Sequence, residues 1–460
     1  MFSRIRIMLA KRRESQRNAK MSRAEFETMK LAKFRNLARH VQQHSPYYAE
    51  IIKARGIDVE TCVPQDFPIL TKALLMANFD RIVTDRRISK EKVAEFLTRS
   101  VDPNEYMFGE YHVLHTSGSS GEVGYFLYSE ADWVSGLSGM RHQQSAPRPR
   151  RPGRFARRFG RFRMSYFAAV GGHFAGVSMV SSAMRGLARA FVKVQLLEVN
   201  SPLPQVIDAL NRFQPDVLGG YTTALKILAE KQNQGVLRLA PMGLATGGEA
   251  MTAADKTMLE AAFKCPAYNG YGTTEHLGMG GGNPDGETMT LYDDNLIYEI
   301  FEDHSLITNL FNFTQPLIRY RMSDILRPVA QTNPTSPYLV IKSLIGRSEK
   351  VPTFLNRDGT EDFISPHTIN EIFVAGIARF QLQLVSKTRF VFKVVLEASL
   401  DEAQRAEAIA GTERRLREIL DQKQMSNVTF DVVPTFDLPV NSRTGKFQLI
   451  VDAPAVVSST

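Results

Sequence analysis

The sequence predicts an α/β protein with two parts: a large, multi-layer N-terminal α/β domain, and a small C-terminal α+β domain joined to it by a hinge. From residue 113 onward, short apolar strands alternate with turns rich in Gly, Ser or Thr and with helices, which is the βαβ rhythm of a mostly parallel sheet. After Gly346 the pattern becomes two strands, a charged amphipathic helix and another strand. The 460 residues also favour more than one hydrophobic core. We therefore expect domains at 1–346 and 350–460.

The individual elements follow from local patterns. Apolar residues at helical spacing predict helical structure over 22–60 that stops at Gly56, and a proline-punctuated loop then enters another helix. Three later units are each predicted to contain a strand, a turn and a helix, and they lie at 113–121, 215–235 and 241–252. Residues 290–345 are predicted to be richer in strands.

Composition favours a cytoplasmic protein without a membrane span. Hydrophobic residues make up 43% and charged residues 23%, and no apolar run approaches the roughly 20 residues that cross a bilayer. The first 17 residues mix Arg into a short apolar stretch, which favours a packed or solvated helix over one that touches a membrane. Cys62 and Cys265 lack metal-ligand spacing, so we expect two thiols in a reducing cytoplasm.

Much of the net charge of +9 is local, because residues 148–163 hold eight arginines interleaved with phenylalanines. This pattern resembles a nucleic-acid-binding stripe. It fits equally a surface that receives CoA, an acidic carrier protein or an anionic lipid, and it also fits a solvated loop.

The stretch "HTSGSSGEVG" at 115–124 has the composition of a phosphate-binding loop. Glycines there allow backbone N–H groups to face one concavity, and hydroxyls add donors; these residues are Thr116, Ser117, Gly118, Ser119, Ser120 and Gly121. A flexible surface turn is the alternative interpretation. The lysine that often follows such loops is absent, and Glu122, Val123 and Gly124 stand there instead.

Further downstream, four more places hold candidate residues. "YNGYGTTEHLG" (268–278) joins Tyr271, Gly272, Thr273, Thr274 and Glu275. Glu275 suits Mg²⁺, which takes carboxylate and phosphate oxygens, and Thr274 suits a phosphate. The other three candidates are Asp324, able to accept both hydroxyls of a ribose, Arg347 at the domain boundary, and Lys446 on a C-terminal loop.

Taken together and in this order, the motifs resemble the adenylate-forming superfamily of acyl-CoA synthetases, adenylation domains and luciferases. That family has a Ser/Thr/Gly loop, Tyr-Gly-x-Thr-Glu, a ribose-binding Asp, a hinge Gly-Arg and a C-terminal Lys, and the resemblance here spans 114–448. "FRNLARHVQQHSPYYAEIIKARG" with "FPILTKALL" is similar to the phenylacetate-CoA ligase-like branch. This sequence departs from the family pattern at two places. One is the phosphate loop without its lysine, and the other is "GRSEK", where relatives often carry two acidic residues after Gly-Arg.

The resemblance implies that a carboxylate and ATP, with Mg²⁺, give an acyl-adenylate and pyrophosphate. Lys446 would act on the reacting phosphate, Glu275 would hold Mg²⁺, Asp324 and Arg347 would fix the ribose, and Glu349 would lie at the hinge. Gly247, Gly248 and Glu249 of "TGGEAM" would line the adenine. The acyl group would then pass to a thiol of CoA or an acidic carrier protein. Transfer to an amine fits the motifs equally, whereas nucleic-acid binding would explain only the arginines.

The acyl pocket is expected within "SYFAAVGGHFAGVSM" and "GGYTTAL", with His173, Phe174 and Tyr221 as an aromatic wall. Each of these three side chains also has a plain structural interpretation. Because the branch favours aryl or arylacetic acids, we expect an aromatic carboxylic acid as the substrate.

Overall fold

The structure is a computed structural model, which describes residues 2–116, 123–138, 161–182, 188–322, 324–330, 336–342, 350–370, 372, 374–439 and 448–453. Helices and sheets alternate in it, so the predicted α/β class is confirmed. Within these residues, no helix combines the length and the apolar character needed to cross a membrane.

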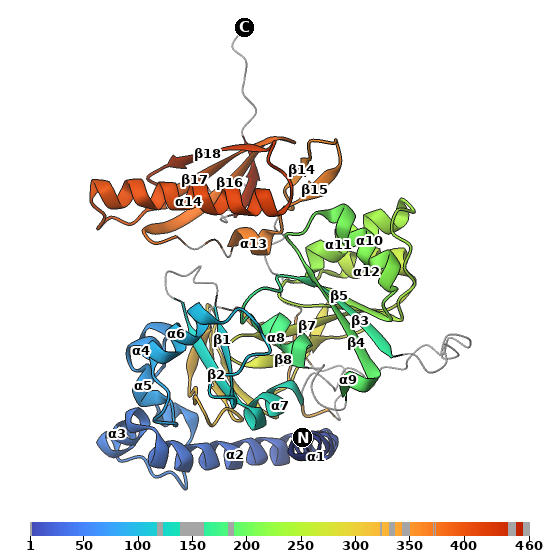
Figure 1. The fold of residues 1–460 in the computed structure, drawn as a ribbon. Coiled ribbons are helices and arrows are strands. Elements are labelled where there is room, and N and C mark those ends of the chain that lie inside the picture. Colours follow the sequence, from blue (N-terminus) through green and yellow to red (C-terminus); the bar gives the residue numbers. More distant parts are fainter. Residues whose placement is uncertain are drawn as a thin grey trace.

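The N-terminal helices lie along one side of the molecule (Figure 1). They are α1 (Phe2–Asn18), α2 (Arg23–His44) and α3 (Pro46–Arg55). Ser22 and Glu25 form a capping box that starts α2, since each side chain accepts a backbone N–H of the other. The expected helical stretch is divided at Ser45, because Pro46 disfavours a helical conformation in the residue before it. As predicted, the helical stretch ends at Gly56. This residue caps α3 and adopts a left-handed conformation with φ of 62°.

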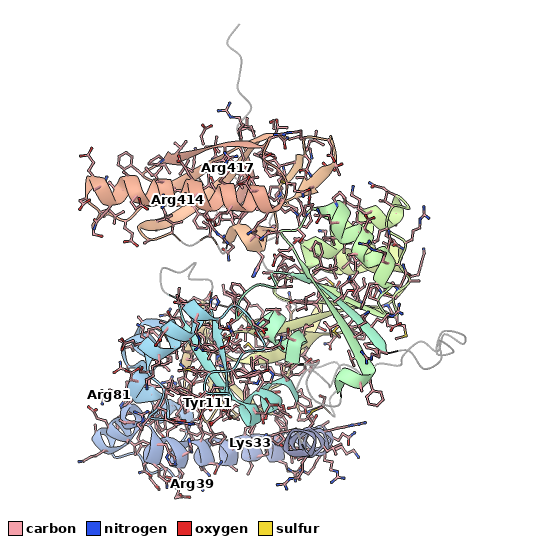
Figure 2. The ribbon with its side chains drawn as sticks, viewed as in Figure 1. Lys33, Arg39, Arg81, Tyr111, Arg414 and Arg417 are labelled. Atoms are coloured by element: carbon pink, nitrogen blue, oxygen red, sulfur yellow. The ribbon has the colours of Figure 1, made fainter. Side chains whose placement is uncertain are left out.

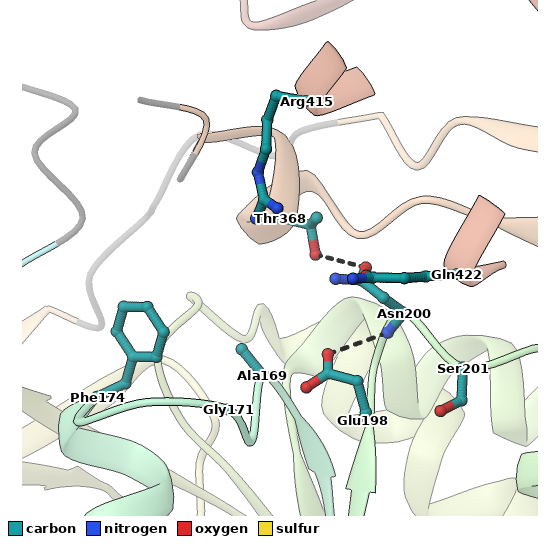
Figure 3. A pocket seen from close by; sticks show the side chains of 9 residues that line it. All are labelled: Ala169, Gly171, Phe174, Glu198, Asn200, Ser201, Thr368, Arg415 and Gln422. Atoms are coloured by element: carbon teal, nitrogen blue, oxygen red, sulfur yellow. Dashed lines mark hydrogen bonds between the residues drawn. The ribbon is translucent and has the colours of Figure 1, made fainter. Parts of the chain in front are cut away.

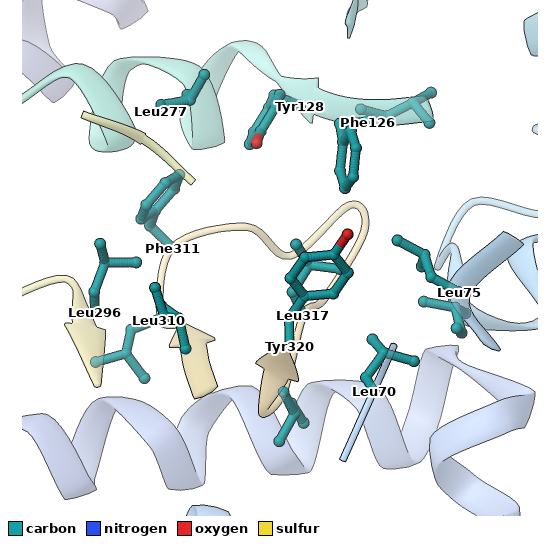
Figure 4. Packing of buried hydrophobic residues seen from close by; sticks show 14 of the residues in the cluster. Leu70, Leu75, Phe126, Tyr128, Leu277, Leu296, Leu310, Phe311, Leu317 and Tyr320 are labelled. Atoms are coloured by element: carbon teal, nitrogen blue, oxygen red, sulfur yellow. The ribbon is translucent and has the colours of Figure 1, made fainter. Parts of the chain in front are cut away.

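Short elements then lead into a hydrophobic core beside α2. They are η1 (Pro64–Asp66), α4 (Lys72–Ala77), α5 (Phe79–Ile82), α6 (Lys90–Arg99), the antiparallel pair β1 (Tyr111–His115) and β2 (Tyr125–Ser129), and α7 (Glu130–Ser138). A second antiparallel sheet contains β10 (Leu296–Ile300), β11 (Ser305–Asn309) and β12 (Tyr320–Met322). Figure 4 shows Phe126 and Tyr128 from β2 above Leu317 and Tyr320, so side chains from both sheets share one core.

The central sheet has eight strands in the described part of the chain, in the order β13-β9-β8-β7-β6-β5-β3-β4. Its parallel strands are β3 (Phe162–Ala168), β4 (Val192–Glu198), β5 (Val217–Gly220), β6 (Gly243–Thr246) and β7 (Ala267–Thr273). The antiparallel strands are β8 (Leu277–Gly282), β9 (Thr288–Leu291) and β13 (Val340–Lys342). The connecting helices are α8 (Ala175–Ser182), α9 (Ala188–Phe191), α10 (Leu203–Phe213), α11 (Thr222–Asn233) and α12 (Ala253–Phe263).

Strand order reverses beside β3. The chain passes from β3 to β4 on one side, and then returns to place β5 on the other side of β3. In open α/β sheets, ligands bind outside the carboxyl ends of the strands at such a reversal. The topology alone therefore directs attention to the carboxyl edge of β3, β5, β6 and β7.

The C-terminal part has its own four-stranded sheet and core. Its elements are β14 (Thr353–Leu355), β15 (Glu361–Phe363), α13 (Pro366–Asn370), β16 (Ile377–Ser386), β17 (Arg389–Leu396), α14 (Glu402–Gln422), β18 (Thr429–Pro434) and β19 (Ile450–Asp452). The sheet order is β18-β17-β16-β19, and Figure 1 shows α14 along it. Phe390 and Phe392 of β17 pack with Leu416 and Leu420 of α14 in a cluster separate from those of the N-terminal part.

Candidate active site

The carboxyl edge of the central sheet collects the polar stretches predicted from the sequence. Residues 169–174 follow β3, Tyr221 follows β5, 247–249 follow β6, and 274–276 connect β7 to β8. Neighbouring parallel strands present their carboxyl ends at one edge, so segments more than 100 residues apart in the chain converge there.

The connection between β1 and β2 provides the base of the candidate phosphate loop. The N–H of Thr116 donates to the carbonyl of Gly124 at 2.9 Å, and the N–H of Gly124 donates to the Thr116 hydroxyl at 2.8 Å. The two ends of the loop are thereby held together. Ser117, Gly118, Ser119, Ser120 and Gly121 lie outside the described residues.

Lys72, which belongs to none of the predicted nucleotide-binding motifs, lies beside this loop. Lys72 is the first residue of α4, and a β-carbon placed on Gly124 would lie 3.0 Å from its Cε atom. A cation in the first turn of a helix opposes the helix dipole, which was a signal in the sequence that this lysine serves another purpose. Lys72 therefore places positive charge next to the loop that lacks its own lysine.

Glu275 lies within electrostatic range of Lys72. Burial raises the pKa of the Glu275 carboxyl, and the nearby Asp324 raises it further, whereas Lys72 and the Thr273 hydroxyl act in the opposite direction. The described residues contain no cluster of three or more His, Cys, Asp or Glu that could bind a metal ion by itself. A single partly buried carboxylate fits Mg²⁺ when phosphate oxygens of a ligand complete the coordination, so the donor set suits a nucleotide-bound ion.

Asp324 is held by Tyr271. The tyrosine hydroxyl donates to Oδ2 of Asp324 at 2.7 Å, and burial together with this carboxylate raises the pKa of Tyr271 well above its usual value. The backbone of Asp324 is fixed as well, because the Ser305 hydroxyl donates to its carbonyl at 3.2 Å. The carboxylate keeps further acceptor capacity for two hydroxyls of a ribose.

The turn after β6 has a tightly packed glycine. Gly248 has φ of 78°, and a β-carbon there would lie 3.1 Å from Cε1 of Tyr221. The side chain of Glu249 faces the start of α11, where it accepts the N–H and the hydroxyl of Thr223 at 2.8 and 2.9 Å. Burial raises the pKa of this carboxyl. The backbone of 247–249 thus remains as the part of this turn that could contact an adenine.

The three residues of the predicted acyl wall have different surroundings. His173 is 1% exposed, and its Nε2 atom lies 3.1 Å from the hydroxyl of Ser100, on the side of α6. Phe174 lines a cavity of about 390 Å³, and its ring lies 4.6 Å from the ring of His115, the residue before Thr116. The Tyr221 ring contacts His367 of α13 at 4.3 Å. Phe174 is therefore the member of this set that faces open space beside the phosphate loop.

Arg347, Glu349 and Lys446 lie outside the described residues, as does the arginine run apart from 161–163. Elsewhere on the described surface, four of the basic side chains labelled in Figure 2, Lys33, Arg39, Arg81 and Arg414, have acidic partners. Lys33 pairs with Glu14 at 2.6 Å, and Arg414 pairs with Glu407 at 2.5 Å. At these positions the positive charge is locally offset.

Comparisons with known proteins identify the class of fold. No family model matches the sequence. Protein CapK of Staphylococcus aureus is 23% identical over 352 residues, which cover 70% of this chain and 68% of CapK. The structure of 2-hydroxyisobutyryl-CoA ligase in complex with 2-HIB-AMP and CoA in the thioesterification state is similar, with a TM-score of 0.58, 17% identity, and coverage of 95% of this chain and 91% of that one.

The same ligase in the postadenylation state with R3-HIB-AMP gives a TM-score of 0.55, 16% identity, and coverage of 95% and 92%. The chain therefore has the same fold as 2-hydroxyisobutyryl-CoA ligase, and this agrees with the fold that the sequence resemblance implied. The phenylacetate-CoA ligase-like branch stays a prediction.

Proposed function

We propose that the protein is an ATP-dependent ligase that converts a carboxylic acid to an acyl-adenylate and pyrophosphate, and then passes the acyl group to an acceptor. The observation that carries this proposal is the convergence of Thr116, Lys72, Glu275 and Asp324. A loop base, a cation and two carboxylates in one place match the needs of a magnesium nucleotide. The fold shared with a CoA ligase whose structures contain acyl-adenylates supports it.

In the first step, a carboxylate oxygen of the acid attacks the α-phosphorus of ATP, and pyrophosphate leaves with the electron pair of the broken P–O bond. Catalysis then consists of positioning and of electrostatic stabilisation of the phosphate oxygens. Lys72 and the Thr116 hydroxyl would bind phosphate oxygens, and Asp324, held by Tyr271, would fix the ribose. Glu275 would hold Mg²⁺, which supplies charge neutralisation at the phosphates.

The C-terminal part would complete the site. We propose that 1–346 and 350–460 act as two domains that change their relative orientation about 346–350 between the two half-reactions. Lys446 would then bring its charge to the reacting carboxylate and α-phosphate, as the sequence resemblance implies. Arg347 would assist at the ribose and Glu349 would lie at the hinge.

An aromatic acid is the proposed substrate. The side chain of Phe174 and the small residues Ala169 and Gly171 border a cavity that has room for a ring. Aromatic rings gain from edge or offset contacts with a wall of this kind. His173, which contacts Ser100 instead, has no part in this proposal.

The test is carboxylate-dependent exchange of pyrophosphate into ATP, measured over a panel of matched aryl, arylacetic and short aliphatic acids. The proposal predicts exchange with at least one acid and a preference for the aromatic members. Phe174→Ala should reduce that preference without removing exchange. If no acid in the panel supports exchange by the folded protein, the proposed function is wrong. If only aliphatic acids support it, the aromatic assignment alone is wrong.

A further inference from the structure

A cavity between the two parts of the chain extends beyond the candidate acyl wall. Ala169, Gly171 and Phe174 border it on the side of β3, and Arg415 and Gln422 of α14 border it from the C-terminal part. Figure 3 shows the side chain of Arg415 extending from α14 toward Thr368 of α13. The cavity therefore meets the acyl wall at one end and the C-terminal part at the other, where an acceptor would approach an acyl-adenylate.

Its most distinctive polar group is the carboxylate of Glu198, at the end of β4. The N–H of Val170 donates to Oε2 at 2.9 Å, and the N–H of Asn200 donates to Oε1 at 3.2 Å (Figure 3). These two bonds fix the orientation of the carboxylate, yet each oxygen retains a lone pair for another donor. Glu198 is thus a preset acceptor of hydrogen bonds on the cavity wall.

Among the described residues, no basic side chain forms an ion pair with the Glu198 carboxylate. Lys423 is near enough for Glu198 to act on its charge, but the Lys423 ammonium donates to Oδ1 of Asp362 and to the carbonyls of Val199 and Ser201, at 2.9, 3.1 and 3.0 Å. Those three bonds use all three of its donors. Arg415, across the cavity, donates to Glu418 at 3.0 Å. Of the two charged side chains that line the cavity, Arg415 is thus paired with Glu418, and Glu198 is the one that has no ion pair among the described residues.

We propose that the acceptor of the acyl group is a primary amine, whose ammonium form binds Glu198. This inference rests on the proposed adenylation and names the acceptor for it. A partly buried carboxylate attracts an ammonium ion and gains a charge-assisted hydrogen bond from it. The same carboxylate next to a thiol would raise the pKa of the thiol and so reduce the thiolate that attacks a carbonyl. The electrostatics of the cavity thus favour amide over thioester formation.

The step balances as follows. The bound ammonium gives one proton to Glu198, and the freed nitrogen lone pair attacks the acyl carbonyl carbon, forming the C–N bond. The bond between that carbon and the phosphate oxygen breaks, and AMP leaves with the electron pair. The nitrogen loses its second proton to the leaving phosphate or to water, and Glu198 returns its proton to solvent. The products are an amide and AMP.

The experiment uses the full chain and an acid that supports pyrophosphate exchange. Glycine, ethanolamine and CoA are supplied separately at equal concentration, and amide or thioester is quantified by mass spectrometry. The variants are Glu198→Gln, Glu198→Asp and, as a matched control, Glu407→Gln, which removes a carboxylate from an exposed ion pair on α14. Thermal unfolding of each variant checks that it is folded.

We expect amide from at least one amine at a higher kcat/KM than thioester from CoA. Glu198→Gln should lower kcat/KM for the amine roughly 10- to 100-fold, as for loss of a hydrogen bond to a charged group, and should leave pyrophosphate exchange unchanged. Glu198→Asp should recover part of the loss, and Glu407→Gln should match the parent. Efficient thioester formation with no amide, or an unchanged amine kcat/KM in a folded Glu198→Gln, overturns the inference while exchange persists. Absence of exchange with every acid instead rejects the proposed function on which the inference rests.

Discussion

The contact between the two parts of the chain depends on a buried ion pair, and its removal gives the most quantitative prediction. Lys423 follows α14 and is paired with Asp362 of β15 at 2.9 Å, with both side chains 0% exposed. The Lys423 ammonium also donates to two carbonyls that follow β4, and Asp362 accepts the N–H of Leu203 at 2.8 Å. The ring of Phe363 lies 4.6 Å from the ammonium. These groups join α14 and β15 to the N-terminal part.

Lys423→Met removes the charge but keeps most of the apolar volume. It leaves the carboxylate of Asp362 buried without its counter-ion, and loss of one partner from such a pair costs about 3–5 kcal/mol. Asp362→Leu should lower the free energy of unfolding by a similar amount, because it leaves the Lys423 ammonium buried without its counter-ion. The double variant should be destabilised by much less than the sum, because no uncompensated charge remains.

The assay is a double-mutant cycle on the free energy of unfolding, followed by hydrogen exchange at β15 and α14. Hydrogen exchange is needed because a chain with several cores can unfold in more than one step. Arg414→Met, at an exposed pair, is the control and should change stability by less than about 1 kcal/mol. If Lys423→Met alone is as stable as the parent, the pair does not join the two parts as described.

Four further results are expected. Lys72→Met should lower pyrophosphate exchange roughly 10²-fold, since it removes charge beside the phosphate loop, whereas Lys72→Arg should retain most of it; equal rates would exclude Lys72 from the site. Asp324→Ala should raise the KM for ATP more than the KM for the acid, and an altered acid preference with unchanged ATP KM would move Asp324 out of the nucleotide site. Burial raises the pKa of Asp293 from 3.8 to about 6, so the folded state binds this proton more tightly than the unfolded state; its contribution to the free energy of unfolding should increase as pH falls from 7 to 4, and Asp293→Asn should remove it. Lys446→Ala should reduce adenylation by 10²-fold or more, and near-normal exchange would reject its proposed role.

Local rules predicted the elements well. Helix ends at Gly56, strands followed by glycine-rich turns, and the C-terminal strand–helix–strand pattern all depend on residues close in sequence. The break between α2 and α3 at Ser45 could also have been predicted from the sequence, because Pro46 disfavours a helical conformation in the residue before it. The position of the candidate site at the carboxyl edge of the sheet came instead from the strand order in the structure.

Side-chain directions could not be predicted in this way. His173 and Phe174 are neighbours, yet one contacts Ser100 and the other lines the cavity, because packing against α6 decides which of them turns inward. Glu249 stands in the expected turn, but its carboxylate is used by Thr223, 26 residues earlier in the chain. Such choices depend on contacts between distant segments, which one sequence without an alignment does not reveal.

Lys72 illustrates the opposite case. The candidate phosphate loop lacks its own lysine, and the sequence motifs offered only Lys446 as a lysine that would act on the phosphates. The ammonium-bearing chain of Lys72 reaches the loop from a helix more than 40 residues upstream. Its unfavourable position in the first turn of α4 was the local evidence that could have identified it.

If the site activates a carboxylate with ATP, pyrophosphate exchange depends on the charge of Glu275, and the Glu275→Gln variant measures that dependence. The amide keeps the shape of the side chain but removes the charge that would hold Mg²⁺, so we expect a loss of about 10²-fold or more in acid-dependent exchange. Asp303→Asn, on the exposed turn between β10 and β11, should exchange at the parental rate. Acid-dependent exchange by Glu275→Gln at the rate of Asp303→Asn would show that this site does not activate a carboxylate with ATP.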